Sequence, residues 1–172
     1  MLFLETGDWT TWTEEVIEDV LYAIARDNEE ENLIYIVAQA PECLLMLALV
    51  SVTKGERDAR WQFADWLGEV FVREPRAEEI LLLLLRDDDE YVRRRALRSL
   101  ARVGSTQTEH YCKIAWDSGN QYQRIMALEA LHIIRSGLLS TYIAQAMADS
   151  STYLPGYARE LLEKIDSRSA KP

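Results

Sequence analysis

Apolar residues recur along this chain at the three- and four-residue spacing of amphipathic helices, and the alternation typical of strands is nowhere sustained. Signals that start or stop helices interrupt this pattern about every fifteen residues. The sequence therefore predicts an all-α protein of about ten helices. They cover residues 12–26, 29–40, a segment after Pro41 that ends at 52, and then 57–73, 76–86, 90–103, 106–116, 120–135, 139–148 and 153–166.

Two helix starts near the N-terminus carry the same polar signature. Thr11 followed by Glu14 predicts a capping box, in which a hydroxyl and a carboxylate satisfy backbone N–H groups of the first turn. Asn28 followed by Glu31 repeats the signature before the second helix.

Three stretches in the second half of the chain repeat each other at a fixed offset of 31 residues. The positions in register are Tyr91, Tyr122 and Tyr153, then Ala96, Ala127 and Ala158, then Leu100, Leu131 and Leu162. Such an offset is typical of stacked supersecondary units, here helical hairpins that bury their apolar stripes against each other. We expect the alanines where helices approach closely and the leucines to fill the seam. The prediction is an α-solenoid of antiparallel helix pairs.

The chain length of 172 residues suits a single domain. Within residues 1–172 we expect divergent acidic helices over 1–75, regular repeats over 76–166 and a frayed tail over 167–172.

The segment 80–104 combines a leucine-rich helix, an acidic turn ending at Asp89, a Val-Arg pair at the start of the next helix, and then Ala96, Leu100 and Gly104. In this order of features the sequence resembles a HEAT repeat. The likeness extends over about 77–166, is weak before residue 76, and places Pro155 where the family has an arginine. It implies a HEAT-like superhelix without catalytic residues.

The same resemblance implies roles for four charged residues of the turns. In HEAT proteins the turn aspartate and the following arginine typically bond between adjacent repeats. The residues in these positions are Asp88, Asp89, Arg93 and Arg124.

The net charge of −10 lies entirely in the first 53 residues, which hold eleven carboxylates and one base, Arg26. The remaining residues hold eighteen charges of each sign. Such acidity makes nucleic acid an unlikely partner, because affinity for phosphates depends on Lys and Arg. It favours a basic protein as partner, although the charge can also serve solubility alone.

The candidate partner-binding residues lie in this acidic part. They are Trp9, Trp12, Glu14, Glu15, Glu18, Asp19, Glu29, Glu30 and Glu31. Aromatic side chains beside charges of a single sign are typical of binding hot spots. One or two carboxylates at a helix start are enough to interact favourably with the helix dipole, and this part of the chain has more. The leading hypothesis is a non-enzymatic interaction module. Its sharpest version is an immunity protein that neutralises a basic toxin nuclease.

A second possible surface consists of Arg94, Arg98 and Arg102, which share one helix face. These arginines could contact phosphate if the protein resembled HEAT-like DNA glycosylases or lyases. The preferred interpretation is a solvated face that pairs internally, with Glu90 one turn before Arg94. A scaffold that joins two cellular proteins is the third hypothesis.

The sequence predicts no cofactor and no metal site, because His110 and Cys112 have no partner ligands at the usual spacing. The longest apolar runs, 43–50 and 80–85, are far below the ~20 residues of a membrane-spanning helix. Residues 1–5 do not resemble a secretory signal. Cys43 and Cys112 are expected to be reduced thiols, which predicts a cytoplasmic protein.

Overall fold

A computed structural model describes residues 9–169. The prediction that residues 1–5 do not form a secretory signal concerns residues outside this range. The chain divides into two compact units, Met1–Val103 (unit 1) and Gly104–Pro172 (unit 2). The boundary follows the repeat at 80–104 and does not coincide with residue 75, where the pattern of the sequence changes. That the whole chain folds as one domain stays a prediction.

The described residues are all-α, as predicted, and every predicted helix is present with its ends within three residues. Unit 1 contains η1 (Trp9–Thr11), α2 (Glu14–Arg26), α3 (Asn32–Ala38), α4 (Pro41–Lys54), α5 (Arg57–Val70), α6 (Pro75–Leu84) and α7 (Glu90–Arg102). Unit 2 contains α8 (Thr108–Asp117), α9 (Gln121–Ile133), α10 (Leu139–Met147) and α11 (Leu154–Ser169). Because α11 continues to Ser169, the predicted tail is wrong for 167–169, and 170–172 lie outside the described residues.

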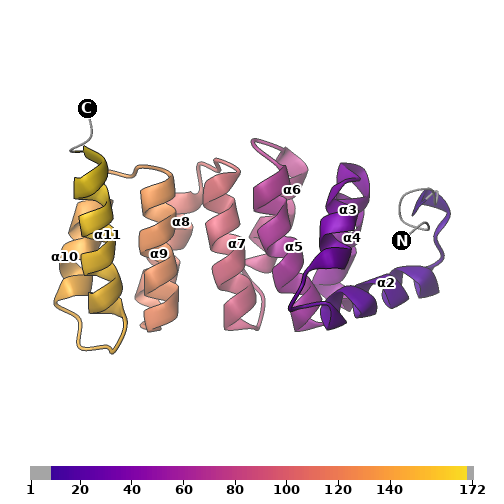
Figure 1. Ribbon diagram of the computed structural model, residues 1–172, viewed down its shortest axis with the longest axis horizontal. Coiled ribbons are helices and arrows are strands. Elements are labelled where there is room, and N and C mark those ends of the chain that lie inside the picture. Colours follow the sequence, from indigo (N-terminus) through magenta and orange to yellow (C-terminus); the bar gives the residue numbers. More distant parts are fainter. Residues whose placement is uncertain (1–8, 170–172) are drawn as a thin grey trace. The chain divides into compact units, whose positions relative to one another are not determined.

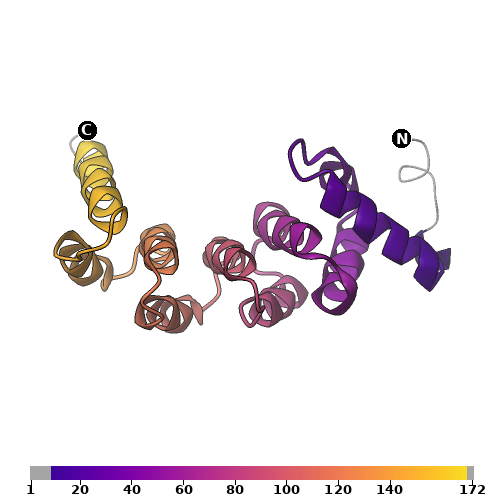
Figure 2. The ribbon, with the colours of Figure 1, turned by 90° about the horizontal axis from the view of Figure 1, so that it is seen from below.

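Both units are built from stacked helix pairs, which confirms the predicted solenoid architecture (Figure 1). In unit 1 the pair α4–α5 packs on the pair α6–α7, and in unit 2 the pair α8–α9 packs on α10–α11. Figure 2 shows two layers in each unit, with α5 and α7, or α9 and α11, in one layer. The stack therefore includes a hairpin before residue 75, in the region expected to be divergent.

Helices α2 and α3 precede this stack and pack on α4 and α5. Helix α2 runs across the axes of α3 and α4 rather than along them (Figure 1). Its buried side chains include Leu21 and Ile24, which lie three residues apart on one face of the helix. One face of α2 therefore packs on the stack, and the polar residues of the opposite face are exposed to solvent.

The seam positions confirm most of the predicted register. Ala96, Ala127 and Ala158 are fully buried. Leu100 and Leu131 are fully buried too, but Leu162 is 37% exposed. The prediction that Leu162 fills the seam is therefore wrong: its neighbour Leu161 is buried, and no hairpin among the described residues of unit 2 follows α11 to cover Leu162.

The helix caps differ from two of the sequence predictions. Thr13, and not Thr11, caps α2 by accepting a hydrogen bond from the Val16 backbone N–H at 3.4 Å. Glu31 precedes α3 in the left-handed region at φ 54° and makes no side-chain cap there. The carboxylate of Asp27 instead accepts a hydrogen bond from the Leu33 N–H at 2.6 Å. Both capping boxes are thus replaced by single contacts from nearby side chains.

Helices α5 and α7 approach each other more closely than side chains ordinarily permit. A Cβ atom placed on Gly68 would lie 2.7 Å from the Ser99 Cα and 2.6 Å from its Cβ. Because both residues are buried and neither can move aside cheaply, glycine at position 68 allows this contact. The close approach brings the polar side chains of α5 and α7 within hydrogen-bonding distance.

Candidate functional site

The carboxylates at the start of α2 divide into two sets. Glu14 and Glu18 form ion pairs with Lys54 at the end of α4, and the Glu18 oxygen lies 2.9 Å from Nζ. Glu15 and Asp19 lie on another stripe of α2, are exposed, and carry no ion-pair partner among residues 9–169. Two of the seven predicted carboxylates therefore share one lysine that lies 36 residues or more away in sequence.

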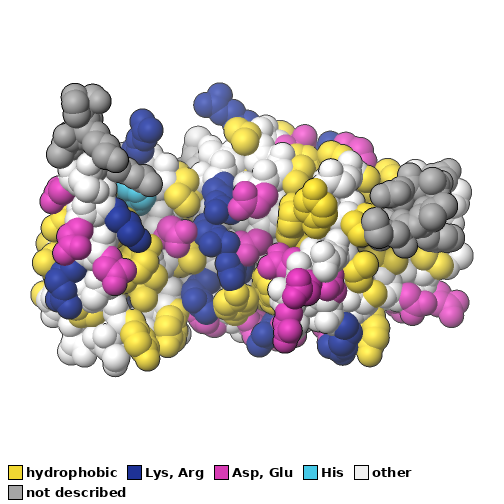
Figure 3. Space-filling model, in the orientation of Figure 1, with side chains coloured by type: hydrophobic (Ala, Val, Ile, Leu, Met, Phe, Trp, Pro, Cys, Tyr) yellow, Lys and Arg dark blue, Asp and Glu magenta, His cyan; other side chains and the backbone are white. Residues whose placement is uncertain are grey.

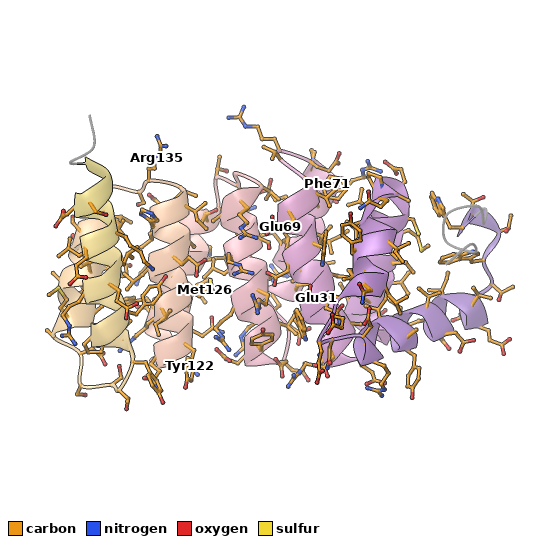
Figure 4. The ribbon with its side chains drawn as sticks, in the orientation of Figure 1. Glu31, Glu69, Phe71, Tyr122, Met126 and Arg135 are labelled. Carbon is orange, nitrogen blue, oxygen red and sulfur yellow. The ribbon has the colours of Figure 1, made fainter. Side chains whose placement is uncertain are left out.

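The glutamates of the turn between α2 and α3 also divide into one that contacts another helix and two that do not. Glu31 lies at the start of α3 and accepts a hydrogen bond from the Trp66 indole N–H on α5 at 3.1 Å (Figure 4). Glu29 and Glu30 are exposed and make no ion pair among the described residues. Four carboxylates of the predicted set are thus exposed and have no ion-pair partner among the described residues, and we call them the acidic edge: Glu15, Asp19, Glu29 and Glu30.

An exposed aromatic side chain lies on the same stripe of α2 as the first two residues of the acidic edge. Tyr22 follows Asp19 by three residues and is 56% exposed. The Arg26 guanidinium lies over its ring, 4.5 Å from the centroid, and also pairs with Glu56 at 2.9 Å. Sequence analysis missed Tyr22, although its helical spacing from Glu15 and Asp19 was available as a signal.

The two predicted aromatic anchors lie elsewhere. Trp9, in η1, lines an apolar cleft of about 390 Å³ between α4 and α6, together with Leu49, Ile80 and Leu83. Arg76 borders the cleft and binds both carboxylate oxygens of Glu42 at 2.7 and 2.8 Å. Trp12 follows η1 and is partly buried. Trp9 therefore lines a cleft together with apolar side chains of α4 and α6 and with three charged residues, Glu42, Arg76 and Glu79.

The arginines of α7 pair with carboxylates, as the internally paired interpretation predicts. Arg94 pairs with Glu90 at 2.7 Å, whereas Arg98 and Arg102 pair with residues of α5. Their partners are Asp65, at 2.7 Å from Arg98, and Glu69. Figure 3 shows this band of basic side chains over α7 beside acidic side chains, and Figure 4 shows Glu69 on α5.

Asp65 is the centre of this network. Its second carboxylate oxygen binds Arg95 at 3.0 Å, so one side chain joins two arginines of α7. The Arg95 guanidinium also lies 4.7 Å from the ring centroid of Tyr91, and Tyr91 packs edge-on against Trp61 at 5.6 Å. Through these contacts the arginines of α7 hold α5 and α7 together.

Ion pairs also join successive hairpins at their turns. Arg60 on α5 binds Asp87 through two nitrogens, at 2.6 and 3.0 Å, and Asp88 at 3.2 Å. Arg124 on α9 binds Asp149 at 2.7 Å in the turn before α11. Asp88 and Arg124 thus bond between hairpins, as the HEAT resemblance implies.

The other two residues of the implied set bond within their own hairpin. Arg93 donates to the backbone carbonyl oxygens of Asp87 and Asp88 at 2.7 and 2.9 Å. Asp89 caps α7 by accepting from the Tyr91 and Val92 N–H groups. For Arg93 and Asp89 the implied contact between repeats is therefore wrong.

The described residues contain no group of three or more His, Cys, Asp or Glu side chains that could hold a metal ion. Cys43 and Cys112 are both unpaired and buried. Burial raises the pKa of the Cys43 thiol to about 11 and, together with the charge of Glu109, that of Cys112 to about 12. Thiols with such pKa values are poor nucleophiles near neutral pH. Within residues 9–169, no helix has both the length and the apolar character needed to cross a membrane.

Comparison with known proteins agrees with the fold. The family model for HEAT repeats matches residues 45–132, from within α4 to near the end of α9. The match begins earlier than the sequence resemblance, because the α4–α5 hairpin is a repeat of the stack. No curated protein sequence matches the chain. Since the family model covers half of the chain, this protein belongs to the HEAT repeat family.

Proposed function

We propose that this HEAT-repeat protein is a non-catalytic interaction module that binds a basic partner protein through the acidic edge. HEAT repeats are typical of protein-interaction scaffolds, and the proposal adds a surface and a partner chemistry to that general role. The observation that carries it is the set of four exposed carboxylates that have no ion-pair partner among the described residues, whereas Glu14 and Glu18 nearby share Lys54.

Electrostatics support this surface over others on the chain. The net charge of −10 resides in the first 53 residues, to which the whole acidic edge belongs. A field of one sign steers a partner of opposite sign and raises the association rate, most strongly at low salt. Tyr22, exposed on the same stripe of α2, offers an amphipathic side chain of the type enriched in hot spots.

A toxin nuclease domain is one partner with the required chemistry. Such a domain needs a positive surface to hold nucleic acid, and an acidic protein can occupy that surface in place of phosphates. An immunity protein is therefore the specific form of the proposal, to be tested by inhibition of the partner's nuclease activity.

The enzyme alternative has less support. Its only candidate surface was the arginine face of α7, and Arg94, Arg98 and Arg102 all pair with carboxylates of unit 1. A phosphate would have to displace Asp65 or Glu69 from these arginines, and so weaken the contact between α5 and α7. A partner that binds the acidic edge leaves the ion pairs between α5 and α7 intact.

Affinity purification from native host cells with tagged wild type and two tagged variants tests the proposal. The test variant reverses Glu15, Asp19, Glu29 and Glu30 to Lys. The control reverses Glu79, Asp117, Glu129 and Glu160 to Lys, which changes the net charge by the same amount at other positions. Wild type and control should retain the same basic protein from native host cells, and salt should elute it.

The test variant should retain little or none of that protein, although its circular dichroism should match the wild type. Equal recovery with the test variant would refute the proposed surface. Recovery of several unrelated proteins by all three forms would favour the general scaffold.

A further inference from the structure

The outer face of the last hairpin, α10–α11, is apolar. Its hydrophobic side chains line a groove of about 520 Å³. They are Leu139, Ile143, Ala144 and Met147 on α10, and Leu162 and Ile165 on α11. Met147 is 41% exposed and Leu162 is 37% exposed. Among the described residues, no helix after α11 covers this face.

This groove continues the seam between hairpins. Leu162 stands in the same register as Leu131 of α9, which is fully buried. Leu131 belongs to the hairpin α8–α9, on which α10 and α11 pack. The α10–α11 face therefore has the shape and composition of a surface that receives another helix pair.

Charges beside Leu162 are arranged for pairing with a copy of the same helix. Arg159 precedes Leu162 by three residues and Asp166 follows it by four, so both lie on its side of α11. Both are exposed, and neither has an ion-pair partner among the described residues. If two α11 helices lie antiparallel with their midpoint at 162–163, Arg159 of each copy is opposite Asp166 of the other.

We propose that the α10–α11 face is a homodimer interface, in which two copies of this chain meet about a two-fold axis near Leu162. The apolar grooves cover each other, and two reciprocal pairs between Arg159 and Asp166 flank them. A two-fold contact uses the same patch on both copies and closes, so assembly stops at the dimer. This interface lies in unit 2 and goes beyond the proposed binding of a basic protein, which uses unit 1.

Sedimentation velocity of the full chain over a wide range of concentration tests the dimer. Wild type should change from monomer to dimer as concentration rises, whereas Leu162→Glu should weaken the dimer by at least about tenfold. Ile114→Glu is the matched control, because Ile114 is 52% exposed on α8 and does not line the groove. Wild type that stays monomeric throughout, or a dimer that Leu162→Glu leaves unchanged, overturns the proposal.

Charge exchange tests the two-fold arrangement separately. Arg159→Glu and Asp166→Arg should each weaken the homodimer, because each places like charges opposite one another. Mixing the two variants should restore association as a heterodimer, in which every facing pair again has opposite signs. If the mixture associates no better than either variant alone, the arrangement about Leu162 is wrong.

Discussion

Units 1 and 2 bury the same kind of seam but differ in the polar contacts that accompany it. In unit 1, Asp65 and Glu69 of α5 bind three arginines of α7, and Gly68 permits the close approach of the two helices. In unit 2, Tyr122 and Tyr153 stack with ring centroids 6.0 Å apart where α9 and α11 begin. Among the described residues of unit 2, one ion pair, Arg124 with Asp149, joins the two hairpins. The network in which two carboxylates bind three arginines along facing helices is therefore a feature of unit 1.

The first test of this difference removes the centre of the α5–α7 network. Asp65→Ala should lower the free energy of unfolding by about 2–3 kcal/mol, because it leaves Arg95 and Arg98 partly buried without their carboxylate. Asp117→Ala in unit 2 removes an exposed pair with Lys113 and should cost less than about 0.5 kcal/mol. Urea denaturation measures both values. Equal effects of the two substitutions would contradict the distinction between the units.

The second test compares the same substitution at two glycines. Gly68→Ala should destabilise the protein by about 1–3 kcal/mol, since its Cβ would overlap Ser99. Gly156→Ala on α11 meets no atom within 4 Å and should stabilise the helix by up to about 1 kcal/mol. Thermal unfolding of both variants provides the measurement. Shifts of the same sign would show that α5 and α7 do not approach as closely as described.

The third test uses the buried cysteines as one reporter in each unit. In native protein near neutral pH both thiols should react slowly with a thiol reagent, because burial keeps their pKa near 11 and 12. In the Asp65→Ala protein, Cys43 should react at least about tenfold faster while Cys112 changes less. Single Cys→Ala variants assign the two rates. Equal acceleration of both thiols would mean that the units open together.

The same thiols give an expectation for stability at alkaline pH. The folded pKa of each thiol exceeds the unfolded value of 9.0, so the folded state holds its proton more tightly. This contribution is present below pH 9.0 and is lost as pH rises toward the folded pKa. Replacing Cys43 by Ala should therefore reduce the fall in stability between about pH 9 and 11, measured by urea denaturation. An unchanged fall would argue against the raised pKa.

The sequence predicted the helices and most of the seam because these features depend on local periodicity. Ala96 and Leu100 are buried where the repeat offset places them. The prediction for Leu162 is wrong because no described helix after α11 packs on it, and the repeat offset alone does not show whether a helix covers that position. Thr11 and Thr13 both precede α2, and only the backbone geometry selects Thr13 as the cap.

The candidate site was less predictable, because residues distant in sequence decide which of the N-terminal carboxylates are paired. Lys54 reaches Glu18 across 36 residues, and Arg98 reaches Asp65 across 33. Charge counting places the excess of carboxylates in the N-terminal third. It could not tell the paired Glu14 from the unpaired Glu15 next to it.

The association rate with the recovered basic partner, measured by surface plasmon resonance at low and high salt, tests the central claim most directly. Wild type and the control with Glu79, Asp117, Glu129 and Glu160 reversed should associate quickly at low salt and several-fold more slowly at high salt. The variant with the acidic edge reversed should associate slowly at both. If this variant associates as fast as the control and responds equally to salt, the acidic edge is not the binding surface.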